Sequence, residues 1–338
     1  MRPHDAVRLL AVPLLVALLA GLATVPATAT TPSYAGPAAR PPIAQQLVLG
    51  HHLQRTRNTV HERTLTRAAR KRSGHALRIA TFNLRAGMGI KKFKRGVRAV
   101  RRHAGVVGLQ EIGKARRHRW LRASRTWGHF HPSYIRQNPV IWNKNRFRKV
   151  AARGQRIAKS RWLLGQLPGH RRQDGKRKHS TATVVRLRDK ATGRRLSVVN
   201  VHLVHGAVKG GKPWPRRPRV FNLYRDQMRG VVRTVRKERR WGRVFVVGDF
   251  NAGYRADRHH ALPRLPYRSF KRVRMNSMWQ GTRYLRHDRG TRNDALIDQV
   301  WSKRLPRRAR VLRGVRPSDH FPAVATYRLR KAHHRLRG

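Results

Sequence analysis

From Leu77 onward, the sequence is built from short apolar runs, most of them rich in β-branched residues. Gly, Asn, Asp or Pro bounds most runs, and this pattern is typical of β-strands. The runs are LRIATF (77–82), VVGL (106–109), VIW (140–142), TATVVRL (181–187), LSVVNVHL (196–203), VFVV (244–247), ALIDQVW (295–301) and AVATYRL (323–329). So many strands over roughly 250 residues predict an α+β domain in which two sheets pack together.

Two stretches between these runs have a helical pattern. Between Phe221 and Val235, apolar residues recur every three or four positions with Arg and Lys between them. Residues 91–103 form a weaker, strongly basic helical pattern. The sequence therefore predicts helices interspersed with the strands.

The first 76 residues differ in composition from the rest. Arg2 and Arg8 precede an apolar stretch over 9–20, and Ala27-Thr28-Ala29 resembles a signal-peptidase site. A membrane anchor is the alternative, but the stretch is short and Pro13 interrupts it, so cleavage near Ala29 and secretion are favoured. We expect a signal peptide over 1–29, a disordered basic linker over 30–76, one domain over 77–330 and a basic tail over 331–338. The mature chain is then expected to have no transmembrane segment.

The charge balance of the chain is extreme. It has 80 Lys and Arg residues against 13 Asp and Glu, a formal net charge of +67. A polyanion would relieve the resulting repulsion, and nucleic acid is the obvious candidate. Alternatively, Arg simply serves as the general polar residue of this chain, since the excess is spread along its whole length. The two interpretations are compatible.

Because acids are scarce, their positions are informative. Glu111, Asp249, Asp298 and Asp319 each adjoin an apolar run, whereas most other acids lie among polar residues. A single such acid is best interpreted as a turn cap or an arginine partner. Four acids near strand ends can instead converge at one rim of a sheet and bind a hard cation such as Mg²⁺.

Asparagine and histidine accompany these acids. Asn83 follows the first run, His202 lies within an apolar run, and Asn251 and His320 follow Asp249 and Asp319 closely. Amides offer a donor and an acceptor without charge, and imidazoles titrate near neutral pH. The combination disfavours a purely structural interpretation of the four acids.

Six segments occur in order along the chain: ATFNLR, GLQEIG, VNVHL, VVGDFNA, LIDQVW and SDHFPAVA. Together they resemble the endonuclease/exonuclease/phosphatase family, metal-dependent phosphodiesterases and phosphatases related to DNase I, from about Leu77 to Leu329. The resemblance implies a four-layered α/β/β/α sandwich of two mixed sheets flanked by helices, with the active site at one rim.

The resemblance also implies a role for each candidate residue. Asn83, Glu111 and Asp319 would hold the divalent ion, expected to be Mg²⁺ or Mn²⁺ with Ca²⁺ as a further candidate. Asp249 would orient or deprotonate the attacking water, and Asn251 would hold that water and a phosphate oxygen. His202 and His320 would bind the scissile phosphate, and Asp298 would orient His320. An acidic partner of His202 is also implied, and the sequence does not assign it.

We expect a secreted, monomeric, metal-dependent endonuclease of low sequence specificity that acts on DNA, with RNA as a further substrate. Trp214 and Tyr254 are candidates for stacking on bases, or else pack locally. A sphingomyelinase-like phospholipase or an inositol-phosphate-type phosphatase ranks second. A polyanion-binding protein without catalytic activity ranks last, because none of the six segments is broken.

Overall fold

The computed structural model describes residues 75–133, 136–163, 176–177, 179–282 and 290–331. All of them belong to one compact unit, Thr64–Gly338. The expected signal peptide lies outside the described residues, as does all of the expected linker except its last two residues. Within the described ranges, no helix is both long and apolar enough to cross a membrane.

Most strands of the described chain form two six-stranded sheets. In spatial order, the first sheet consists of β15 (Arg308–Val311), β16 (Ala323–Leu329), β1 (His75–Asn83), β2 (Val106–Gln110), β4 (Val140–Asn143) and β3 (Trp127–Phe130). The second consists of β13 (Asn276–Ser277), β14 (Asp298–Ser302), β12 (Arg243–Asp249), β9 (Arg195–His202), β8 (Ser180–Asp189) and β5 (Phe147–Ala158). Each sheet has one parallel pair, β1 with β2 and β9 with β12, among antiparallel pairs. Two small hairpins join β6 (Arg161–Trp162) to β7 (Lys176–Arg177) and β10 (Val208–Lys209) to β11 (Lys212–Pro213).

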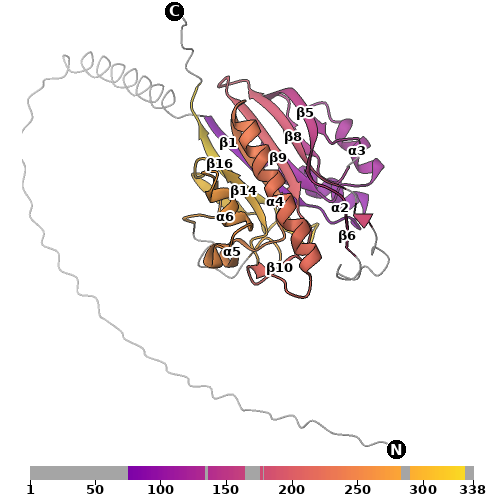
Figure 1. The fold of residues 1–338 in the computed structure, drawn as a ribbon. Coiled ribbons are helices and arrows are strands. Elements are labelled where there is room, and N and C mark those ends of the chain that lie inside the picture. The colour runs from indigo at the N-terminus through magenta and orange to yellow at the C-terminus, as the bar shows by residue number, and fades with distance from the viewer. Residues whose placement is uncertain (1–74, 134–135, 164–175, 178, 283–289, 332–338) are drawn as a thin grey trace, which may run out of the picture. The chain divides into compact units, whose positions relative to one another are not determined.

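Helices cover the outer face of each sheet, which gives the expected four layers (Figure 1). The first sheet is covered by α2 (Ile90–Arg101) and α3 (Ala115–Arg122). The second is covered by α4 (Pro218–Arg239), α5 (Tyr254–His260) and α6 (Pro266–Lys271). The prediction of an α/β/β/α sandwich is therefore confirmed.

Strand β1 shows how the sequence specifies these layers. Leu77 and Ile79 belong to the core between the sheets, whereas Ala80 and Phe82 belong to the core under α2 and α3. Side chains of a strand alternate between its faces, and here both faces are buried. This explains why the run reads as continuously apolar.

The two sheets approach closely near the rim. A Cβ atom on Gly108 of β2 would lie 2.4 Å from Val247 Cγ2 and 2.7 Å from Asn200 Oδ1 in the facing sheet. Gln110 Nε2 donates to Asn200 Oδ1 over 2.7 Å, which links β2 to β9 within the buried interface. Glycine and this polar link bring the ends of β2 and β9 together.

The sequence placed most elements but missed others. Seven of the eight apolar runs coincide with strands, whereas ALIDQVW enters β14 only from Asp298. The expected helix over 221–235 lies inside α4, and the basic one corresponds to α2. Strand β5 was not predicted, because it is an edge strand in which charged residues interrupt the apolar pattern.

Candidate active site

Strand direction brings the candidate residues to one edge of the sandwich. Because β1 and β2 are parallel, Asn83 lies opposite Gln110, and Glu111 follows at once. In the second sheet, Asp249 lies opposite His202 in the parallel neighbour β9. The antiparallel strand β14 begins there with Asp298, which pairs with Asp249.

Asn83 joins the two sheets at this edge. Its Nδ2 lies 2.9 Å from Glu111 Oε1 in the first sheet and 3.0 Å from Asp249 Oδ2 in the second. Its Oδ1 accepts a hydrogen bond from the backbone nitrogen of Arg85, 3.0 Å away. One buried amide nitrogen thus holds two carboxylates close together across the sheet interface.

The backbone around Glu111 is held from several sides. Glu111 has a φ of 63°, in the left-handed region that only a few non-glycine residues adopt. Its Oε2 accepts a hydrogen bond from Ala86 N at 2.6 Å, and its carbonyl accepts one from Arg117 Nη1 at 2.9 Å. Arg117, fully buried on α3, also donates to the carbonyls of Ala86 and Met88. Such strain persists at sites where the surroundings over-determine the conformation.

Arg117 was not identified from the sequence. It is one of several arginines in α3, and nothing in the local pattern distinguishes the buried one from its exposed neighbours. Its position becomes evident only when the 84–90 loop and the end of β2 are brought together.

Asp249 is buried, and the loop after it turns sharply. Gly248 has a φ of 153°, and a Cβ atom there would lie 2.0 Å from the carbonyl oxygen of Val201. Asp249 Oδ1 accepts a hydrogen bond from Asn251 N at 2.9 Å. Asn251 has a φ of 49°, and its Nδ2 donates to Leu203 O at 2.9 Å. The loop therefore directs Asp249 inward and keeps Asn251 beside it.

Two histidines lie near the same carboxylate oxygen. His202 Nε2 is 3.6 Å from Asp249 Oδ2, and His320 Nε2 is 3.9 Å from it. His320 Nδ1 lies 2.8 Å from Asp298 Oδ2, and both side chains are buried. Burial alone would lower the pKa of His320, but the charge and hydrogen bond of Asp298 outweigh it and raise that pKa to about 9. His320 is therefore an imidazolium at neutral pH.

The acidic neighbour of His202 among the described residues is Asp249. The resemblance implied a separate carboxylate for this histidine, and the ion pairs of the described chain give His202 this one partner. Both histidines therefore lie near Asp249. His320 has Asp298 as a second acidic partner.

Asp319 lies at the exposed rim. Its Oδ2 pairs with Arg292 Nη2 at 3.3 Å. Ser318 Oγ lies 3.2 Å from Asp319 Oδ1 and donates to the carbonyl of Asn83 over 2.8 Å. Asp319 is therefore tied to Asn83 through Ser318, while its carboxylate pairs with an arginine at the surface.

The donor set suits a hard divalent ion. Asn83 holds carboxylate oxygens of Glu111 and Asp249 close together, and Asp319 adds a carboxylate at the rim. Such oxygens are the ligands that Mg²⁺, Mn²⁺ and Ca²⁺ prefer. As the amide of Asn83 lies, it presents Nδ2 to the carboxylates, so ligation by Asn83 requires its amide to turn over. Asp249, Asp298 and His320 also form a close group, but His320 as an imidazolium is no metal ligand.

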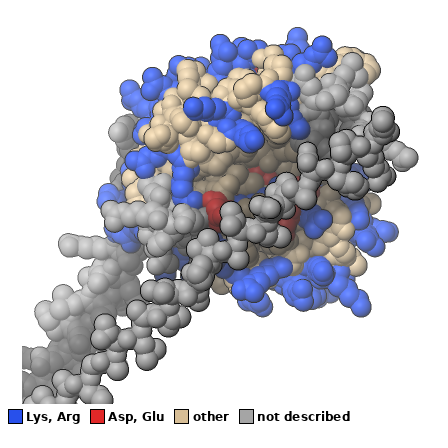
Figure 2. Space-filling model, turned by 90° about the horizontal axis from the view of Figure 1, so that it is seen from below, with Lys and Arg blue, Asp and Glu red and all other residues tan. Residues whose placement is uncertain are grey.

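The surroundings of the site are basic. The face seen from below shows acidic atoms in its middle and Lys and Arg spread around them (Figure 2).

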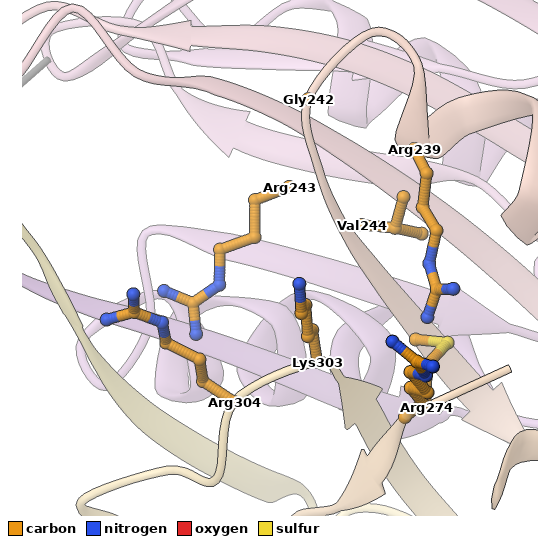
Figure 3. A pocket seen from close by; sticks show the side chains of 8 residues that line it. Arg239, Gly242, Arg243, Val244, Arg274, Lys303 and Arg304 are labelled. Carbon is orange, nitrogen blue, oxygen red and sulfur yellow. The ribbon is translucent and has the colours of Figure 1, made fainter.

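A separate cavity of about 410 Å³ lies at the opposite end of β12, lined by Arg239, Arg243, Arg274, Lys303 and Arg304 among others. Figure 3 shows the basic groups of these residues turned toward one another. Its lining contains neither carboxylate nor imidazole, so it lacks groups for acid–base catalysis.

The candidates for base stacking pack locally. Tyr254 is fully buried against Trp301 and Tyr267, so of the two alternatives for this residue the structure supports local packing. Trp214 is half-buried, with the guanidinium of Arg217 4.0 Å from its ring centroid.

Comparison with known proteins establishes the fold. No family model and no curated protein matches the sequence. The structure matches an endonuclease/exonuclease/phosphatase family protein from Bacteroides thetaiotaomicron with a TM-score of 0.53 and 14% identity, over 76% of this chain and 99% of that one. The chain has the endonuclease/exonuclease/phosphatase fold.

Other proteins with this fold have varied substrates. D. rerio TDP2 complexed with a single-stranded DNA product matches with a TM-score of 0.51 and 14% identity, over 74% of this chain and 98% of that one. The mannosyl-6-phosphatase Bt3783 of B. thetaiotaomicron matches with a TM-score of 0.51 and 14% identity, over 75% and 99%. At this identity the likeness establishes the endonuclease/exonuclease/phosphatase fold and leaves the substrate of this chain open.

Proposed function

We propose that this chain is a secreted, metal-dependent phosphodiesterase that hydrolyses nucleic acid. The observation that carries the proposal is the contact of Asn83 with both Glu111 and Asp249. That contact holds two carboxylates together at one edge, where His202 and His320 also lie, and it supports the proposal of a metal site there. The fold alone does not supply this combination, since folds host many functions.

Each residue of the site has its own role in the proposed hydrolysis. Asp249 accepts the proton of the attacking water, because it is the buried carboxylate that lies beside both phosphate-binding histidines. Asn251 orients that water and a phosphate oxygen. His202 and His320 donate hydrogen bonds to the phosphate, and the positive charge of His320 offsets the charge that develops in the transition state. Asp298 fixes the ring of His320 by accepting from Nδ1.

Glu111 and Asp319 would hold the divalent ion, with Asn83 fixing Glu111 or joining it as a ligand. When bound, such an ion neutralises phosphate charge as a Lewis acid. The residues then release a phosphate monoester and a free hydroxyl, with no covalent intermediate on the protein.

The charge of the chain supports nucleic acid as the substrate. A protein with a net charge of +67 gains affinity for a phosphate backbone through counterion release, without reading sequence. Basic side chains surround the acidic centre on the face that Figure 2 shows. The DNA complex of a protein with this fold is consistent with such a substrate.

The surface disfavours a lipid substrate. Among the described residues, the large apolar side chains that are exposed are Val150, Trp162 and Leu305, and they come from separate segments. A membrane-acting phospholipase presents a contiguous apolar patch. A phosphatase acting on small phosphate monoesters stays the second candidate, because a protein with this fold has that activity.

A substrate panel tests the proposal. Supercoiled plasmid, single-stranded RNA, sphingomyelin vesicles and a sugar phosphate are each incubated with the purified protein in Mg²⁺, Mn²⁺ or Ca²⁺, and in EDTA. We expect metal-dependent nicking of the plasmid that EDTA abolishes. Turnover of sphingomyelin or the sugar phosphate without nicking would contradict the nuclease proposal.

Two further measurements test the partner and the location. The logarithm of DNA affinity should fall linearly and steeply with the logarithm of salt concentration, and a flat dependence would mean that the charge is not used on nucleic acid. Sequencing the N-terminus of exported protein should find a start near Thr30. An intact Met1 would contradict secretion through a cleaved signal.

A further inference from the structure

Three histidines meet at the edge of the first sheet, and the proposed catalysis uses none of them. His118 lies on α3, His129 on the edge strand β3, and His131 just after that strand. Their ring centroids are 4.1 to 5.2 Å apart, and one ring nitrogen from each lies within 4.8 Å of the others. Residues two apart on an extended chain share a face, so His129 and His131 approach His118 from the same side.

Backbone carbonyls fix which ring nitrogens carry protons. His118 Nε2 lies 2.9 Å from the carbonyl oxygen of Arg136, so Nε2 carries the proton and Nδ1 carries the lone pair. His131 Nδ1 lies 2.9 Å from the carbonyl oxygen of Pro132, which leaves its Nε2 as the lone-pair nitrogen. Metal-binding histidines characteristically donate their second nitrogen to a carbonyl or carboxylate in this way.

Burial acts on two of the three rings, those of His118 and His129. Burial lowers the pKa of His118 to about 4, and burial also lowers that of His129 to about 3. Neutral imidazole is the form that binds divalent transition metals.

The spacing of the rings suits a single ion. His118 Nδ1 and His129 Nε2 are 2.9 Å apart and share a hydrogen bond. Two nitrogens bound to one tetrahedral Zn²⁺ lie roughly 3.3 Å apart, given a Zn–N bond of about 2.0 Å. The ion therefore requires a small opening of this pair and a shift of the His129 proton to its other nitrogen.

Solvent reaches the cluster from one side. A cavity of about 270 Å³ adjoins His118 and His131 and is also lined by Arg119, Arg122 and Arg136. A fourth ligand can enter through this cavity. The positive charge of the three guanidinium groups disfavours binding of a cation alone. A negatively charged fourth ligand, hydroxide or chloride, is favoured because it offsets the positive charge of the ion and of these groups.

We propose that His118, His129 and His131 form a binding site for a divalent transition metal of the Zn²⁺ class, separate from the oxygen-ligand site at the strand ends. All-nitrogen ligation selects Zn²⁺, Co²⁺, Ni²⁺ or Cu²⁺ over Mg²⁺ and Ca²⁺. The bound ion would fasten α3 to β3. It would thereby also steady Arg117, the neighbour of His118 that holds the carbonyl of Glu111.

The test uses protein purified without a histidine tag and kept in excess Mg²⁺, so that oxygen-ligand sites are occupied. Co²⁺ is titrated while its visible absorption is recorded, and bound Zn²⁺ is counted by mass spectrometry after dialysis. The parent should bind one equivalent with the intense bands of a four-coordinate site. His131→Gln, at a half-buried position outside the strand, should weaken binding at least about tenfold.

The matched control is the double variant His259→Gln, His260→Gln. These histidines are also adjacent, with ring centroids 4.9 Å apart, and belong to α5. Binding should survive in this variant, and its loss there would overturn the assignment. Equal binding by His131→Gln and the parent would also overturn it. X-ray absorption at the zinc edge of the parent, which needs no variant, should show three imidazole ligands, and a shell of oxygen alone would refute the site.

Discussion

His320 Nδ1 lies 2.8 Å from Asp298 Oδ2, and this buried carboxylate keeps the imidazole of His320 protonated. The pair spans the second sheet and the loop before β16, so the fold has to be complete before it forms. The imidazolium lies 3.9 Å from Asp249, where it can face a phosphate held near that carboxylate.

Replacing Asp298 with Asn should move the pH profile of cleavage. An Asn side chain can still accept from Nδ1, but the charge that raises the pKa of His320 is gone, so this pKa falls from about 9 toward its ordinary value. Since the protonated ring is the active form, the alkaline limb of kcat/KM should shift to lower pH. The loss should be roughly 10- to 100-fold at pH 8 and smaller at pH 6. Parallel profiles for the variant and the parent would contradict this role.

Removing the amide of Asn83 should weaken metal binding. Asn83→Ala leaves Glu111 Oε1 and Asp249 Oδ2 without the donor that holds them. We expect the Mg²⁺ concentration for half-maximal cleavage to rise about 10- to 100-fold, as for other groups that orient metal ligands. Asn145→Ala, at an exposed turn, is the control and should leave the Mg²⁺ dependence unchanged. An unchanged dependence in Asn83→Ala would show that this amide does not position the ligands.

A methyl group at Gly108 should push the sheets apart. Gly108→Ala places a Cβ against Val247 and Asn200, both buried, and overpacking of this kind costs about 1–3 kcal/mol. Gly314→Ala is the control, because nothing lies within 4 Å of its Cβ position. Urea unfolding measures both variants. Equal stability of the two would mean that the sheets do not need glycine at this contact.

Asp257 should make the protein less stable as pH rises. Burial raises the pKa of Asp257 to about 7, although a hydrogen bond from Tyr267 N partly opposes this. The carboxyl is deprotonated in the unfolded chain above about pH 4 and protonated in the folded chain below about pH 7. Its contribution to stability is therefore full below pH 4 and is lost as pH rises through 7.

Asp257→Asn tests this contribution. Between about pH 5 and 7 the parent should lose up to roughly 1.4 kcal/mol per pH unit through this group. The variant lacks the titrating carboxyl, and its Asn oxygen can still accept from Tyr267 N. Its unfolding free energy should therefore change less over that range. The same slope in both proteins would place the pKa of Asp257 near its ordinary value.

The strand ends of the site could be predicted from sequence because the signal is local. VFVVGDFN carries its own buried strand, its turn and its acid, so Asp249 and Asn251 stand out among very few carboxylates. The four-layered fold followed from the run of such segments and their order. Asn83, by contrast, is 166 residues from Asp249, and their contact exists only because the two sheets pack.

Other features had no local signal. In β5, charged residues interrupt the apolar pattern because the strand lies at a sheet edge, and α4 packs on it with Gly230 against Ile157. Helices α5 and α6 have seven and six residues, too few to establish a period. The cluster of His118, His129 and His131 combines a helix with an edge strand, and only the tertiary fold brings them together.

The most direct test of the account is plasmid cleavage by Asp249→Ala beside the parent. Asp226→Ala serves as the control for lost charge. Asp226 lies on α4 and pairs with Arg161 and Arg229. With Mg²⁺ in excess, the account predicts that the initial nicking rate falls at least about 1000-fold in Asp249→Ala and stays near that of the parent in Asp226→Ala. Cleavage by folded Asp249→Ala at the rate of the parent would contradict the assignment of this rim as the active site.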